Sequence, residues 1–187
     1  MAEPASKHAT YQDLLALPAN VVGQLVLGVL HAHARPAPKH ARASSALGGE
    51  LEGPFNRGRG GPGGWIILDE PEVHFGQDVL VPDLAGWRRE RMPELPIDKA
   101  YLELAPDWVC EVLSPSTSGL DRGSKRSVYA KNGVKHLWFV DPDAQTLEVL
   151  ELDGATYRVI DVWSGSTLVR ARPFEAIELE LGALWAR

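Results

Sequence analysis

The chain has 187 residues, with 19 Lys and Arg against 25 Asp and Glu and a net charge of −6 at pH 7. This length suits one domain with a hydrophobic core, and a content of 44% hydrophobic and 24% charged residues excludes a disordered chain. The acidic balance argues against a protein that coats duplex DNA over a wide surface, because such proteins are usually basic. The single cysteine, Cys110, forms no internal disulfide and favours a reducing, cytoplasmic location.

One segment has the length of a membrane span without its composition. Residues 14–34 include no Asp, Glu, Lys or Arg. Pro18, Asn20 and two histidines interrupt the apolar run, and the first two also exclude a signal peptide. We therefore expect no membrane role.

The N-terminal segment 1–18 contains a capping-box pattern from Thr10 to Asp13, which predicts a short helix that ends near Pro18. An apolar run follows. Gly28 divides that run into two short predicted strands that form a hairpin.

A second helix is predicted over 40–51, where apolar residues recur at four-residue spacing. The glycine-rich segment 55–64 follows it and is expected to be an exposed, flexible loop. This loop matches the pattern G-x-G-x-x-G, but Pro62 removes one backbone donor and a strand comes next instead of a helix. We therefore do not predict a dinucleotide site.

The rest of the chain predicts a meandering sheet with one more helix. Strands are expected at 65–68, 72–75, 78–87, 108–113, 135–140, 146–152 and 156–163. A helix is expected over 121–132, closed by Gly133, and the tail 174–185 should pack on the sheet. This order predicts the α+β class, with a mixed β-sheet flanked by helices.

Two carboxylates stand where folding alone does not require them. Asp83 follows an apolar run, and Glu111 interrupts an apolar strand, where a charge is costly unless it is paired, protonated or bound to a cation. If their strands are neighbours, both side chains converge at one edge of the sheet. Oxygen ligands of this kind suit Mg²⁺ or Mn²⁺.

Lys125 has the helical phase of a buried residue. It points between Val128 and Tyr129, the apolar residues of its helix, whereas Lys131 points away. We expect its stem to follow the buried face and its ammonium to lie near the strand of Glu111. A buried ion pair with no catalytic role explains the same residues, so both interpretations stay open.

Other reactive side chains have simpler explanations. The serines in 114–118 lack a nucleophile elbow and suit a turn. Cys110 lies in an apolar strand and is expected in the core. His31 and His33 share a strand face, but no third metal ligand is near them in the sequence.

The motifs around these residues resemble those of one known family. The segment VPDLAGW at 81–87, the segment PDWVCEVLSPST at 106–117 and the stretch 121–142 closely resemble the Uma-two family of bacterial endonucleases. That family belongs to the restriction-endonuclease-like PD-(D/E)XK superfamily. The likeness runs over nearly the whole chain. It implies a single nuclease-like domain over 1–187, with an αβββαβ core and additional antiparallel hairpins.

The resemblance also implies roles for individual residues. Asp83 matches the Asp of the PD element, and Glu111 matches the acid of the (D/E)XK element. The main-chain carbonyl of Val112 falls where the superfamily often supplies another metal ligand. Leu113 stands where the superfamily usually has a lysine, and Lys125 resembles the migrated lysine of this family.

Four further positions bear on the resemblance, two as matches, one as a departure and one as an alternative ligand. His40 matches a histidine common at the start of the first core helix, and Tyr129 belongs to the same motif as Lys125. Gln24 stands where an acidic residue is common, which puts an extra carboxylate ligand in doubt. Glu50 is an alternative source of that carboxylate.

We therefore expect a Mg²⁺- or Mn²⁺-dependent endonuclease that hydrolyses DNA, with Lys125 positioning water or stabilising charge on phosphorus. Arginines on two predicted loops are candidates for phosphate contacts, or serve solubility alone: Arg57, Arg59, Arg88, Arg89 and Arg91. A homodimer follows by analogy with restriction-like nucleases. Two alternatives stay open: an inactive nuclease-like module that binds nucleic acid or protein, and a structural protein.

Overall fold

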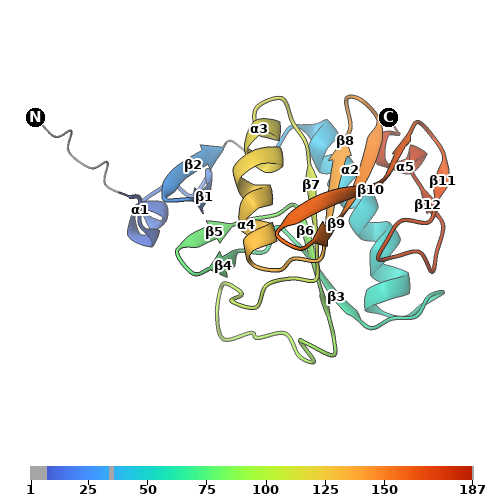
Figure 1. The fold of residues 1–187 in the computed structure, drawn as a ribbon, viewed down its shortest axis with the longest axis horizontal. Coiled ribbons are helices and arrows are strands. Elements are labelled where there is room, and N and C mark those ends of the chain that lie inside the picture. Colours follow the sequence, from blue (N-terminus) through green and yellow to red (C-terminus); the bar gives the residue numbers. More distant parts are fainter. Residues whose placement is uncertain (1–7, 34–35, 187) are drawn as a thin grey trace, which may run out of the picture.

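A six-stranded mixed sheet forms the centre of the protein in the computed structural model, which describes residues 8–33 and 36–186 (Figure 1). Its strand order is β10-β9-β8-β7-β6-β3, and only β7 and β8 are parallel within it. The strands are β3 (Trp65–Asp69), β6 (Leu84–Arg88), β7 (Trp108–Val112), β8 (His136–Asp141), β9 (Thr146–Asp153) and β10 (Thr156–Ser164). The mixed sheet confirms the predicted α+β class.

A four-stranded sheet lies beside the first, in the order β2-β1-β5-β4, and a two-stranded sheet lies near the C-terminus. The strands are β1 (Val22–Val26), β2 (Val29–His33), β4 (Val73–Phe75), β5 (Asp78–Leu80), β11 (Leu168–Val169) and β12 (Leu179–Glu180). The helices are α1 (Tyr11–Leu15), α2 (Pro38–Leu51), η1 (Glu52–Asn56), α3 (Ser118–Leu120), η2 (Asp121–Lys125), α4 (Arg126–Lys131) and α5 (Gly182–Trp185).

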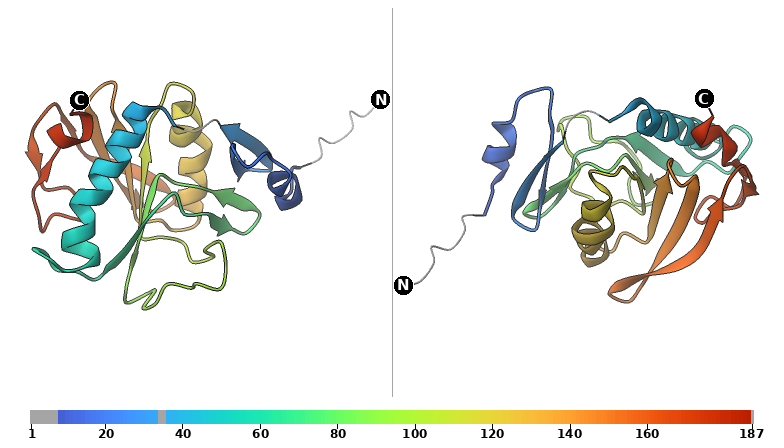
Figure 2. Two further views of the ribbon diagram at one scale, coloured as in Figure 1. Left: turned by 180° about the vertical axis from the view of Figure 1, so that it is seen from behind. Right: turned by 90° about the horizontal axis from the view of Figure 1, so that it is seen from above.

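Helices cover both faces of the six-stranded sheet, with α2 and α5 on one side and the continuous α3–η2–α4 helix on the other (Figure 2). The core order α2, β3, β6, β7, α4, β8 is the expected αβββαβ arrangement. None of the described helices is long and apolar enough to cross a membrane.

Strand β7 shows how side-chain alternation positions the chemistry. Trp108, Cys110 and Val112 face the cluster that contains α2, while Val109 belongs to the cluster that contains α4. By the same alternation Glu111 points towards the α3–η2–α4 helix. A carboxylate thus enters the layer between the sheet and a helix.

The N-terminal predictions are confirmed within the described residues. The capping box between Thr10 and Asp13 starts α1, and Gly28 turns the β1–β2 hairpin with φ +78°. The first seven residues of the predicted N-terminal segment 1–18 lie outside the described part of the chain.

The structure corrects two predicted boundaries. The strand expected over 78–87 is two strands, β5 and β6, in different sheets, because Pro82 between them has no N–H for a ladder. The loop expected over 55–64 begins at Arg57, since Phe55 belongs to η1 and its side chain is buried. Both errors concern residues whose placement depends on distant partners.

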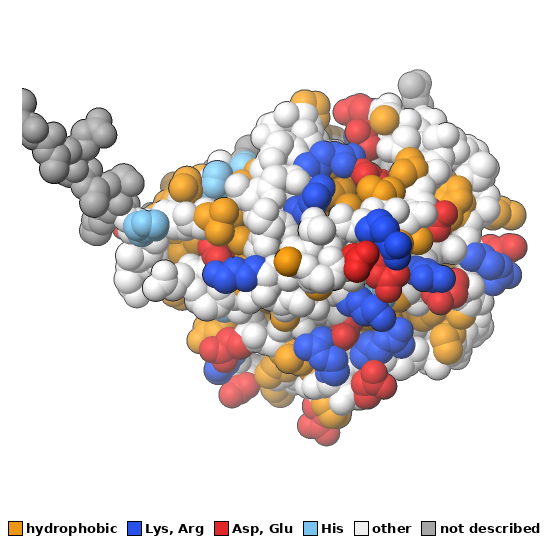
Figure 3. All heavy atoms as spheres, viewed as in Figure 1, with side chains coloured by type: hydrophobic (Ala, Val, Ile, Leu, Met, Phe, Trp, Pro, Cys, Tyr) orange, Lys and Arg blue, Asp and Glu red, His pale blue; other side chains and the backbone are white. Residues whose placement is uncertain are grey.

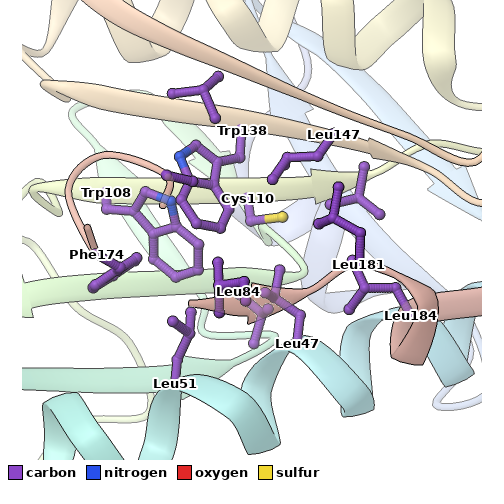
Figure 4. Packing of buried hydrophobic residues seen from close by; sticks show 14 of the residues in the cluster. Leu47, Leu51, Leu84, Trp108, Cys110, Trp138, Leu147, Phe174, Leu181 and Leu184 are labelled. Carbon is purple, nitrogen blue, oxygen red and sulfur yellow. The ribbon is translucent and has the colours of Figure 1, made fainter. Parts of the chain in front are cut away.

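The C-terminal tail completes the core on the α2 side, as the sequence predicted. The Phe174 ring packs against four aromatic rings, with centroid distances of 4.6 Å to Phe55 and 4.9 Å to both Trp65 and Trp108. The ring of Trp138 lies 5.6 Å away, and Figure 4 shows Phe174 facing the tryptophans of β7 and β8. Phe174 therefore ties the tail to the sheet.

We predict that Phe174→Ala lowers the free energy of unfolding by about 3–5 kcal/mol, because it leaves a cavity among aromatic rings. Val159→Ala is the control, since Val159 is 48% exposed on β10 and should change stability by no more than about 0.5 kcal/mol. Urea denaturation followed by tryptophan fluorescence measures both. Equal losses in the two variants would contradict the role given to the tail.

Candidate active site

Asp83 and Glu111 lie opposite each other at one end of β6 and β7. The two strands are antiparallel, and the pairing of Leu84 with Cys110 brings the preceding Asp83 beside Glu111. The backbone N–H of Val112 donates to Asp83 Oδ2 at 2.7 Å. Adjacent strands thus hold both carboxylates at the same edge of the sheet.

Lys125 reaches Glu111 from the helix above. Its Nζ lies 2.7 Å from Glu111 Oε1 and 3.0 Å from Asp121 Oδ1, and the side chains of Lys125 and Glu111 are each only 2% exposed. The Tyr129 hydroxyl donates to the same Glu111 oxygen at 2.5 Å. The burial of Lys125 that the helical phase predicted is observed.

Burial and the neighbouring opposite charges act against each other on the pKa of Glu111 and on that of Lys125. Burial raises the pKa of Glu111 to about 8, although the ammonium of Lys125 opposes the shift. Burial alone would lower the pKa of Lys125, but the carboxylates of Glu111, Asp121 and Asp83 raise it above its ordinary value. Lys125 therefore keeps its charge at neutral pH.

His40, on the first turns of α2, faces Asp83. Its Nε2 lies 3.3 Å from Asp83 Oδ1. Burial would lower the pKa of His40, but Asp83 raises it overall, with a smaller contribution from the backbone of Val112. The imidazole thus lies beside one of the expected metal-binding groups.

Four of these side chains, His40, Asp83, Asp121 and Lys125, border a cleft of about 590 Å³. Its walls come from the β1–β2 hairpin, the start of α2, the turn before β6 and the N-terminal half of the α3–η2–α4 helix. The polar side chains that line it include Gln24, His33, His40, Glu70, Asp83, Asp121 and Lys125. A solvent-accessible cleft therefore reaches Asp83 and Lys125, while Glu111 lies behind Lys125.

Not every predicted residue reaches this cleft. Glu50 is half-buried on α2 but is not among the described residues that line the cleft. The five arginines also lie outside it, because their loops leave the opposite end of β3 and β6. Three are held by local contacts: Arg57 by Glu52, Arg91 by Asp107, and Arg88 over the ring of Trp65. Arg89 contacts Asn56, and Arg59 is exposed.

Four cleft residues had no role, or a different one, in the sequence prediction. Asp121 is the clearest, since its four-residue spacing from Lys125 on a helix could have identified the pair. Gln24 is not a carboxylate, but its Oε1 accepts from the N–H of Val81 at 2.9 Å and so fixes the segment before Asp83. Glu70 has φ +45°, a left-handed conformation that no local sequence signal marks, and His33 reaches the cleft from β2.

The donor set at the strand ends suits a hard divalent cation. Asp83, Glu111 and the carbonyl of Val112 all offer oxygen, the ligand type that Mg²⁺ and Mn²⁺ prefer. Among the described residues, no three His, Cys, Asp and Glu side chains gather into a metal-binding cluster. Asp83, Glu111 and the carbonyl of Val112 would thus leave most of the shell of a bound cation to water or a phosphate.

We predict that Lys125→Met lowers the free energy of unfolding at pH 8 by about 3–5 kcal/mol, because Glu111 and Asp121 lose their buried cation. The loss should shrink at pH 6, where a protonated Glu111 needs no cationic partner. Lys131→Met, an exposed lysine of the same helix, is the matched control. Urea denaturation at both pH values measures the effect, and equal losses for the two variants would refute it.

Comparisons with known proteins identify the family and support the fold. A family described as Uma2, putative restriction endonuclease, matches residues 9–182. The chain is also similar to the crystal structure of a putative nuclease belonging to DUF820 from Anabaena variabilis, with a TM-score of 0.75, 24% identity and coverage of 95% of this chain and 97% of that one. No curated protein matches it significantly. The chain belongs to the Uma2 family of putative restriction endonucleases.

Proposed function

We propose that the protein is a metal-dependent endonuclease that hydrolyses phosphodiester bonds in DNA, with Mg²⁺ or Mn²⁺ as its cofactor. The observation that carries this proposal is the convergence of Asp83, Glu111 and Lys125 at one edge of the sheet, beside an open cleft. Membership of the Uma2 family supports the same reaction class.

Asp83, Glu111 and the carbonyl of Val112 would hold the cation. The chemistry that a divalent cation supplies in such a site is polarisation of the phosphate and a lowered pKa of a coordinated water. Tyr129 fixes the carboxylate of Glu111 through its hydroxyl, and the N–H of Val112 fixes that of Asp83. Both carboxylates are thus oriented before any ligand arrives.

Lys125 acts as a charge rather than as a base. Because the surrounding carboxylates raise its pKa, the ammonium does not accept a proton at neutral pH. Two of its three N–H groups face Glu111 and Asp121, and the third can stabilise the negative charge that develops on the phosphoryl oxygens. Burial raises the pKa of the Cys110 thiol well above its ordinary value, so Cys110 is no competing nucleophile.

One observation is equally compatible with the alternative of an inactive, nuclease-like binding module. Lys125 and Glu111 contact each other directly in a buried ion pair, and a purely structural pair would look the same. Cleavage and binding must therefore be measured separately.

We predict that the protein nicks supercoiled plasmid in Mg²⁺ or Mn²⁺, and that Asp83→Asn, Glu111→Gln and Lys125→Met each slow nicking about 100-fold or more. Asp161→Asn and Lys135→Met are matched controls, since both residues are exposed and away from the cleft. The variants are compared at a temperature where each is folded.

Two results would reject this proposal. Nicking that survives all three site substitutions would show that other residues carry the reaction. DNA binding without cleavage in either metal would favour the inactive module instead.

A further inference from the structure

A second cleft, of about 490 Å³, lies on the other side of the helix that carries Lys125. It opens between α4 and the turn that joins β9 to β10. Its described lining consists of Arg126, Ser127, Ala130, Lys131, Gly154, Ala155, Thr156 and Tyr157. These residues include two cations and no carboxylate, although the chain as a whole carries a net charge of −6.

The two cations of this cleft are free, in contrast to nearly all others. Within residues 8–33 and 36–186, only Arg59, Arg126 and Lys131 among the Lys and Arg side chains have no ion pair, hydrogen bond or ring contact. Two of these three share one cleft, where the exposed hydroxyl of Thr156 adds a donor. An anionic ligand would supply the missing partner for both charges.

The surface between the two clefts is smooth. Gly119, Gly123 and Ser127 are exposed and spaced four residues apart, so they lie on one face of the helix. Apart from the neighbouring residues and the backbone of the helix itself, no atom lies within 4 Å of the position that a Cβ would occupy at Gly119 or Gly123. In Figure 3 the strip over this helix is mostly white, as expected for Gly and Ser, with Lys and Arg side chains beside it.

The strip leads from the end of the active-site cleft to the second cleft. Thr117, which lines the first cleft, stands just before Gly119, and Ser127 lines the second. The eight-residue step from Gly119 to Ser127 includes the π-helical turn η2 and spans at most about 12 Å, which corresponds to no more than three to four nucleotides of a DNA strand. A nucleic-acid backbone can therefore follow this strip without meeting a large side chain.

We propose that the second cleft is a phosphate-binding subsite, in which Arg126 and Lys131 hold backbone phosphates of the nucleic-acid strand that enters the active-site cleft. This inference rests on the proposed function and adds to it a contact a few nucleotides from the candidate metal centre. Arg126 offers a planar fork to phosphate oxygens, and Lys131 offers a compact charge.

The test is the salt dependence of DNA binding, measured by fluorescence anisotropy with a short labelled duplex in EDTA. The double variant Arg126→Gln/Lys131→Gln should bind roughly tenfold more weakly at about 50 mM salt. Its slope of log affinity against log salt concentration should be smaller by about 2, one unit for each lost phosphate contact. The control is Lys135→Gln/Arg158→Gln, which removes two nearby cations that have carboxylate partners.

An unchanged affinity and slope, or an equal loss in the control, would overturn the subsite. Inorganic phosphate at constant ionic strength should not displace the duplex; displacement at millimolar phosphate would instead assign the cleft to free phosphate. Plasmid nicking is followed in parallel. A smaller slope in the double variant, together with a wild type that never nicks, would support the subsite and reject the nuclease proposal. Nicking by the wild type with an unchanged slope in the double variant would support the nuclease proposal and reject the subsite.

Discussion

The buried carboxylate of Glu111 constrains how the neighbouring helix and strand pack around it. It sits on a central strand and is 2% exposed, where an unpaired charge would be costly. The α3–η2–α4 helix supplies Lys125 and Tyr129 to the same oxygen, which fixes the rotation of that helix on the sheet. Asp83 joins the group because β6 pairs with β7 in the register that places the two acids opposite each other.

This arrangement is poorly explained by stability alone. Apolar residues of similar volume often stabilise a core as well as a buried ion pair or better, so such a pair is weak evidence for a structural purpose. Here the group also borders a cleft that reaches Asp83 and Lys125. The acidic composition is compatible with the proposed cation site, since a bound cation would supply local positive charge. For the proposed nuclease, contacts with DNA phosphates would come from few cations, among them the unpaired Arg126 and Lys131.

The sequence predicted those features that depend on local periodicity. The alternation in β7 and the helical phase of Lys125 were sufficient to place Glu111 and Lys125 face to face. Local patterns in the sequence could not predict the division of 78–87 into two strands or the burial of Phe55, because both depend on partners far away in the chain. The left-handed conformation of Glu70 and the local pairing of Arg57 and Arg91 are likewise tertiary effects. The apolar surroundings of Asp83 and Glu111 singled out both carboxylates, and the family resemblance gave them roles. Neither gave a role to Asp121, which completes the charge group.

The most direct measurement is anomalous X-ray scattering from crystals soaked with Mn²⁺, for the wild type and Asp83→Asn. We predict a manganese peak between the carboxylates of Asp83 and Glu111, within reach of the carbonyl of Val112, that disappears in the variant. No peak at this position, with Lys125 still bound to Glu111 in both crystals, would contradict a metal centre and leave a structural ion pair.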